Sequence, residues 1–145
     1  MLSILKPPSP ESDGTYTQST YDTSFIQALG ELKHPQAYEI LVSLSRHPRK
    51  KVRQEVVRQL AQYPSRRTML VLIQLLEDPE IEVRREVGKV LAKMTRAHSD
   101  ITGRSFAEKS AEELQSPYRI WLKNNPDTLP EQPNFEATED RNFAL

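Results

Sequence analysis

The sequence predicts an all-α fold, a short α-solenoid of about three helical hairpins with an extended arm at each end. Three observations lead to this prediction. Apolar residues recur at steps of three and four through residues 21–96. Prolines, several of them after His or Asp, interrupt that stretch at intervals. Residues 47–61, HPRKKVRQEVVRQLA, are nearly repeated 31 positions later by residues 78–92, DPEIEVRREVGKVLA.

Five helices are predicted in the repeated region, and none of its segments alternates well enough to predict a strand. Spacing and punctuation place them at 21–33, 36–46, 49–62, 66–77 and 80–96. His34 ends the first helix and Pro35 opens the second, because Pro suits the first helical position. Asp78 and Pro79 are expected to provide the N-cap and first-turn Pro of the fifth helix.

The repeat defines a unit of two helices. At an offset of 31 residues Val52 aligns with Val83 and Leu60 with Leu91, and a further step back brings Leu29 into the same position. The unit therefore recurs about two and a half times. A helical hairpin of this length cannot bury its apolar face alone, so neighbouring units are expected to stack into two helical layers.

The repeated segment resembles the second helix of a HEAT repeat, in the short bacterial form also found in phycobilisome-lyase-like proteins. The matching positions are Asp78, Val83, Arg84, Val87, Leu91 and Ala92. His47 stands where the family has Asp, which is a departure in the earlier unit. Residues 101–106 and 117–126 are similar to the closing segment of many bacterial HEAT chains, where a short helix bears a Trp. The resemblance covers about residues 20–126 and implies a fold more than a function.

Composition divides the chain into a flexible N-terminal arm at 1–20, a HEAT-like repeat domain at 21–125 and a flexible acidic tail at 126–145. Both ends are poor in apolar periodicity. Phe135 and Phe143 are isolated apolar residues in polar, acidic surroundings of the tail. Such residues are candidate anchors that fold onto a partner, and a plain disordered tail is the alternative.

Basic residues concentrate in the centre, where residues 46–67 hold eight basic side chains against the single acidic Glu55. The candidate partner-binding residues there are Arg46, Arg49, Lys50, Lys51, Arg58, Arg66 and Arg67. Together they would steer an acidic partner. The alternative is a solvated face that covers the acidic tail. Hairpin geometry puts the two groups of turn residues at opposite ends, so they need not form one patch.

Arg53 and Arg84 occupy identical repeat positions and have two interpretations, anion binding or a ladder in which each Arg bonds Asp or backbone carbonyls of the next unit. The family resemblance favours the ladder, since a buried Arg must be paired, and it gives Asp78 a structural role. Trp121 is expected to act as an apolar plug over the last repeat rather than a ligand platform. Ser116 and Pro117 are predicted to start its helix.

The sequence argues against catalysis, metal binding and a cofactor. It has no cysteine, its three histidines form no ligand pair, and it lacks a Gly-x-Ser-x-Gly motif or a Gly-rich phosphate loop. Glu55 and Glu86 recur at repeat positions, which is typical of ion pairs rather than an acid–base pair. No enzyme activity and no small-molecule ligand are expected.

The expected function is a non-catalytic protein–protein interaction module, an adaptor or accessory subunit whose partner has an acidic surface. One alternative is a nucleic-acid-binding module that uses residues 46–67, although Tyr63 is the only aromatic residue there. Another, implied by the resemblance, is handling of a phycobiliprotein or its bilin. The N-terminus lacks the apolar core of a signal peptide and no segment is long enough to span a bilayer, so a cytoplasmic location is expected.

Overall fold

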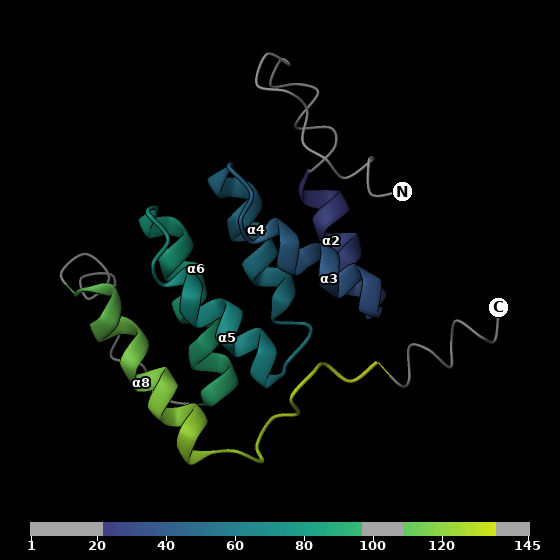
Figure 1. Ribbon diagram of the computed structural model, residues 1–145. Helices are drawn as coiled ribbons and strands as arrows, with labels where there is room; N and C mark the ends of the chain where they lie inside the picture. Colours follow the sequence, from purple (N-terminus) through teal and green to yellow (C-terminus); the bar gives the residue numbers. More distant parts are fainter. Residues whose placement is uncertain (1–21, 97–108, 136–145) are drawn as a thin grey trace.

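The computed structural model describes residues 22–96 and 109–135 of the chain, and the regular secondary structure within these ranges consists of six α-helices and no strand. The helices are α2 (Thr23–Leu32), α3 (Pro35–Leu44), α4 (Lys50–Leu60), α5 (Arg66–Leu75), α6 (Ile81–Thr95) and α8 (Ala111–Asn124). The predicted all-α solenoid is confirmed (Figure 1).

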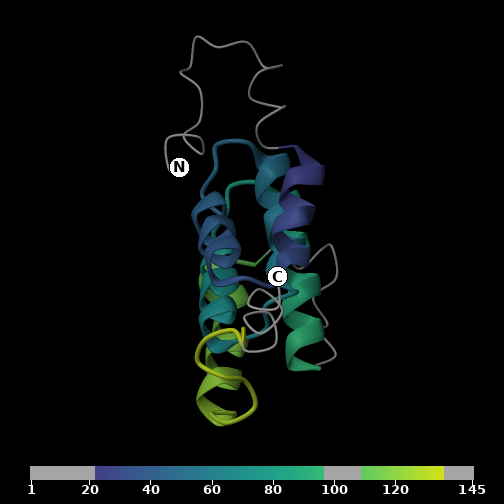
Figure 2. The same cartoon turned by 90° about the vertical axis from the view of Figure 1, so that its right-hand side faces the viewer.

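The helices alternate between two layers. Helices α2, α4 and α6 pack side by side in one layer, while α3, α5 and α8 follow one another in the other (Figure 2). Helix α3 also packs on α4, and α5 on α6. The chain therefore has two complete hairpins, α3–α4 and α5–α6, flanked by α2 at one end and α8 at the other.

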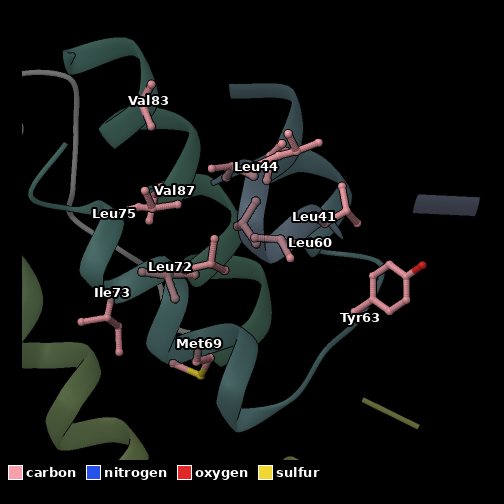
Figure 3. Packing of buried hydrophobic residues seen from close by; sticks show 14 of the residues in the cluster. Leu41, Leu44, Leu60, Tyr63, Met69, Leu72, Ile73, Leu75, Val83 and Val87 are labelled. Carbon is pink, nitrogen blue, oxygen red and sulfur yellow. The ribbon is translucent and has the colours of Figure 1, made fainter. Parts of the chain in front are cut away.

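Repeat-equivalent apolar residues occupy equivalent buried places. Val52 and Val83 are both buried, and Leu60 and Leu91 are inaccessible to solvent. Figure 3 shows residues from both hairpins converging on one continuous core between the layers. Burial of a Leu or Val side chain contributes roughly 1.5–3 kcal/mol. The units thus bury their apolar stripes by stacking on one another.

The turn that precedes α6 differs from the predicted capping, and the turn before α4 is built in the same way. The N-caps are Arg49 and Glu80, so each Pro lies before the cap and not in the first helical turn. The side chains two residues upstream close the turn instead. His47 Nδ1 accepts a hydrogen bond from the Arg49 amide at 3.0 Å, and Asp78 Oδ1 accepts one from the Glu80 amide at 2.9 Å. His47 therefore takes over the turn-closing part of the aspartate's role.

Helix α8 starts earlier than predicted. Its N-cap is Ser110, whose hydroxyl accepts from the Glu113 amide while the Glu113 carboxylate accepts from the Ser110 amide. This capping box begins the helix at Ala111. Pro117 lies inside the helix, not in its first turn, and its exposed ring is accommodated on the solvent side. The reciprocal cap decides the start because it satisfies two amides that no intrahelical carbonyl can reach.

After α8 the chain turns back and runs as an irregular segment past the start of α5 towards α3 (Figure 1). The carbonyls of Pro130 and Glu131 accept hydrogen bonds from the Arg66 and Arg67 amides at 2.8 and 3.1 Å. Residues 126–135 of the predicted flexible tail therefore contact the helical body. The predicted arm at 1–20, residues 101–106, and the tail from 136 onward, with Phe143, lie outside the described residues.

Candidate partner-binding surface

Most of the basic centre is engaged within the chain. The ion pairs join Lys50 to Glu80 and Glu82, Arg58 to Glu55 and Glu86, Arg66 to Glu131, and Arg67 to Glu39. Of the predicted partner-binding cations only Arg46, Arg49 and Lys51 make no ion pair with a described residue. The excess charge counted along the sequence is thus largely neutralised in three dimensions.

Arg58 links the two helices of one layer. Its Nη1 lies 3.2 Å from Glu55 on its own helix and its Nη2 lies 3.1 Å from Glu86 on α6. Gln59 Nε2 donates a further bond of 2.9 Å to Glu55. Both carboxylates have engaged partners, so this arrangement supports the stacking of α4 on α6 and leaves neither glutamate as a free base.

Arg66 and Arg67 fasten the C-terminal part of the described chain. Arg66 donates to the carbonyls of Leu122 and Asn125 at 3.0 and 3.2 Å. Arg67 donates to Glu39 at 2.8 Å and its guanidinium lies 5.1 Å from the centre of the Tyr38 ring. The hydrogen bond from Arg67 lowers the pKa of Glu39. These two cations therefore bind groups of the same chain: Arg66 holds the end of α8, and Arg67 holds α3.

Arg53 and Asp78 form a buried ion pair between the two complete hairpins. Arg53 Nε lies 2.7 Å from Asp78 Oδ2 and Nη2 lies 3.1 Å from Oδ1. The remaining Nη1 donates to the carbonyls of His47 and Pro48 at 2.7 and 2.9 Å. The carboxylate and the two carbonyls occupy all three nitrogens of the Arg53 guanidinium. Arg53 is therefore suited to holding the hairpins together and not to binding an external anion.

Arg84 repeats only half of this arrangement. Its Nη1 donates to the Asp78 carbonyl, as Arg53 donates to the His47 carbonyl one unit earlier. Lys109 stands 31 residues after Asp78, where a further Asp would be needed to continue the series. Within residues 22–96 and 109–135 the Arg–Asp ladder therefore has a single rung.

Trp121 is half-buried and packs against the core from α8.

The outer face of α6 carries a group of basic residues that the sequence analysis missed. They are Arg85, Lys89, Lys93 and Arg96, which are exposed and make no ion pair with a described residue. We call them the cationic stripe. Steps of four residues keep Arg85, Lys89 and Lys93 within an arc of about 80° over roughly 12 Å of helix, and Arg96 is the C-cap that follows. The spacing of cations opposite Val83 and Val87 is the signal that would have identified them.

The depression between the turns before α4 and α6 holds no reactive arrangement. It has a volume of about 580 Å³, and its lining includes the Arg53–Asp78 pair, His47 and Glu80. Burial lowers the pKa of His47, with Arg49 and Arg53 adding to the effect. Among the residues that the structure describes, no three His, Asp or Glu side chains gather where they could hold a metal ion. No helix in the same ranges is long and apolar enough to cross a membrane.

Comparison with known proteins identifies the repeat. A family model of HEAT repeats matches residues 23–86 and, in a second match, residues 39–103. Comparison with curated proteins and with solved structures gives no match. The matched ranges cover more than half of the chain and coincide with the stacked hairpins α3–α4 and α5–α6. HEAT repeats generally serve as non-catalytic scaffolds for protein interaction, and this chain belongs to the HEAT-repeat family.

Proposed function

We propose that the protein is a protein–protein interaction module, an adaptor or accessory subunit of a larger assembly, and that it presents the cationic stripe of α6 to an acidic surface of its partner. The observation that carries the proposal is the contrast between two sets of cations. Those at Lys50, Arg58, Arg66 and Arg67 have carboxylates of the same chain. Those of the stripe make no ion pair with a described residue, although Arg85 is near enough to Glu82 to help lower the pKa of that carboxyl.

The stripe has an energetic cost in the free protein. Arg85, Lys89 and Lys93 follow one another at i and i+4, and like charges at this spacing destabilise a helix by about 0.2–0.5 kcal/mol per pair. A partner that supplies carboxylates would relieve this repulsion. An acidic helix is a suitable partner, because its own i, i+4 carboxylates recur at about 6 Å, the same interval as the cations. The stacked helices behind the stripe hold it in place.

The proposal is tested with three full-length variants that each lose two positive charges. Arg85→Gln/Lys89→Gln removes half of the stripe. Arg46→Gln/Lys51→Gln removes two cations that the sequence pointed to, and Lys109→Gln/Lys123→Gln is the control. Each variant serves as bait in extract of the native cell, with quantitative mass spectrometry of the captured proteins. All six positions are exposed, so the fold should be preserved.

We expect the stripe variant to lose about fivefold of its specific partner, because each exposed ion pair contributes about 0.2–1 kcal/mol. The control should retain the partner. Equal capture by the stripe variant and the control would contradict the proposal. Anisotropy with a generic DNA duplex at low salt tests the alternative partner: salt-sensitive binding that depends on Arg85 and Lys89 would assign the stripe to nucleic acid instead.

A further inference from the structure

The irregular segment after α8 makes side-chain contacts of a specific kind. In residues 129–135, LPEQPNF, Pro133 is buried while Leu129 and Phe135 are half-buried and pack against the core. The Phe135 ring centre lies 6.1 Å from that of Tyr38 and 5.8 Å from that of Tyr63. The segment thus inserts one aromatic side chain against two tyrosines, at distances typical of favourable ring pairs.

Contacts within the helical body hold the two tyrosine rings in place independently of Phe135. Their ring centres lie 5.2 Å apart. Tyr63 donates its hydroxyl proton to the Leu29 carbonyl at 2.6 Å, and the Tyr38 hydroxyl bonds Thr68 Oγ1 at 2.9 Å. Both hydroxyls are therefore held by the helical body at one end of each ring. A receiving surface whose rotamers are already set loses little side-chain entropy when an aromatic side chain docks.

The start of α5 supplies the polar half of the same surface. The amides of Arg66 and Arg67 donate to two successive carbonyls of the segment. Arg66 Nε lies 3.3 Å from the Glu131 carboxylate, and Arg67 Nη1 donates to the Gln132 amide oxygen at 3.4 Å. We call Tyr38, Tyr63, Arg66 and Arg67 the aromatic edge. It contacts the extended backbone, the Glu131 carboxylate and the Phe135 ring of the segment.

The contacts that hold the segment can break without loss of the helices. The Glu131 side chain is 82% exposed, and Gln132 is exposed as well. The segment has no regular secondary structure, and the six helices make their layer contacts without it. A connection of this kind opens at much lower free energy than global unfolding.

We propose that the aromatic edge is a recognition site for extended, acidic protein segments that carry Pro and Phe in the spacing of PEQPNF, and that residues 129–135 occupy it in cis. A partner segment of the same chemistry binds when the chain's own segment is displaced. The residues of the cis segment define the ligand chemistry. The site uses α3, α5 and Tyr63, so it is independent of the cationic stripe on α6.

The test uses a fluorescein-labelled synthetic peptide, DTLPEQPNFE, which copies residues 127–136, and the full-length protein. Phe135→Ala removes the aromatic anchor of the cis segment and leaves the aromatic edge unchanged. In the wild type the chain's own segment competes with the peptide at millimolar effective concentration. Because Phe135→Ala weakens this competitor, the peptide should bind the variant about tenfold more tightly than the wild type. A peptide with Ala in place of its Phe should bind neither protein.

Glu131→Lys serves as a second variant, because it breaks the Arg66 contact at an exposed position and leaves the core intact. It should also bind the peptide more tightly than the wild type. Circular dichroism verifies the fold of both variants, and ¹⁵N spectra should show shifts at the Arg66 and Arg67 amides on peptide addition. Absence of binding to either folded variant, equal affinity for the wild type, or shifts confined to other residues would overturn the proposal.

Discussion

Arg53 of α4 and Asp78 before α6 form a two-point ion pair, with distances of 2.7 and 3.1 Å, that joins the two complete hairpins. Their side chains are only 10% and 4% exposed. A pair removed from water in this way need not add net stability compared with apolar residues. We expect the pair to favour one stacking register instead, because any other register would leave the buried guanidinium and carboxylate apart.

The first prediction concerns this pair. Arg53→Met should lower the free energy of unfolding by about 3–5 kcal/mol, because it leaves the Asp78 carboxylate buried without its cation. Urea unfolding followed by circular dichroism measures the loss. The matched control is Arg84→Met, one unit later, which removes a single bond to the Asp78 carbonyl and should cost about 1–2 kcal/mol. Equal losses in the two variants would contradict a special role for Arg53.

The second prediction is a loss of stability at mildly acidic pH. Burial lowers the pKa of His47 below its ordinary value of 6.5, and the nearby charges of Arg49 and Arg53 add to the effect, while Asp78 also lines the depression. The unfolded chain therefore takes up a proton at higher pH than the folded chain does. By linkage, this histidine's contribution is complete above about pH 6.5 and declines as the pH falls towards the folded pKa.

His47→Asn provides the comparison, because its side-chain oxygen can still accept from the Arg49 amide and does not titrate. Thermal unfolding at about pH 7.5 and about pH 5.5 should show a larger loss for the wild type than for the variant. If both proteins lost the same stability on acidification, the titration of His47 would not be responsible.

The repeat allowed the two helical layers to be predicted from the sequence. The same repeat explains why a count of charges did not show that the basic residues at 46–67 are neutralised within the chain. Val52 and Val83 recur with the helical phase, so their burial followed from spacing alone. The charge count treated residues 46–67 as a local block. Several of the carboxylates that neutralise it lie about one repeat away, as in Lys50–Glu82 and Arg67–Glu39, whose members are 32 and 28 positions apart. Stacking brings residues one period apart into contact.

The docking of the segment after α8 could not be predicted in this way. Residues 129–135 have neither a 3.6-residue nor a two-residue periodicity, and their partners lie far away in sequence, as Gln132 and Arg67 do at 65 positions. Such a contact depends on the final shape of α3 and α5. By contrast, the cationic stripe was visible in the sequence, since Arg85, Lys89 and Lys93 are separated by four residues.

The third prediction uses two buried tyrosines as a matched pair. The Tyr118 hydroxyl is buried and bonds no described residue, whereas the Tyr38 hydroxyl bonds Thr68. Tyr118→Phe should therefore leave the free energy of unfolding unchanged or raise it by about 1 kcal/mol, and Tyr38→Phe should lower it by about 1–3 kcal/mol. Urea unfolding by circular dichroism measures both. A clear loss in Tyr118→Phe would show that its hydroxyl has a stabilising partner.

The fourth prediction separates stability from function at the cationic stripe. Lys89 lies four residues after Arg85 and four before Lys93, so Lys89→Glu converts two repulsive pairs into attractive ones. The free protein should gain about 0.5–1 kcal/mol, and high salt should reduce the gain. Thermal unfolding at two salt concentrations measures it.

The same substitution should weaken capture of the acidic partner, because it places a carboxylate in the middle of the stripe. Lys123→Glu, in the last turn of α8, is the control: its loss through the helix dipole and its gain from a new pair with Arg119 should nearly cancel, and it should keep the partner. If Lys89 were maintained for stability alone, its replacement would lower both the free energy of unfolding and the capture of the partner. Opposite changes in Lys89→Glu are expected only if the repulsion within α6 is retained for binding, and unchanged capture by this variant would contradict that explanation.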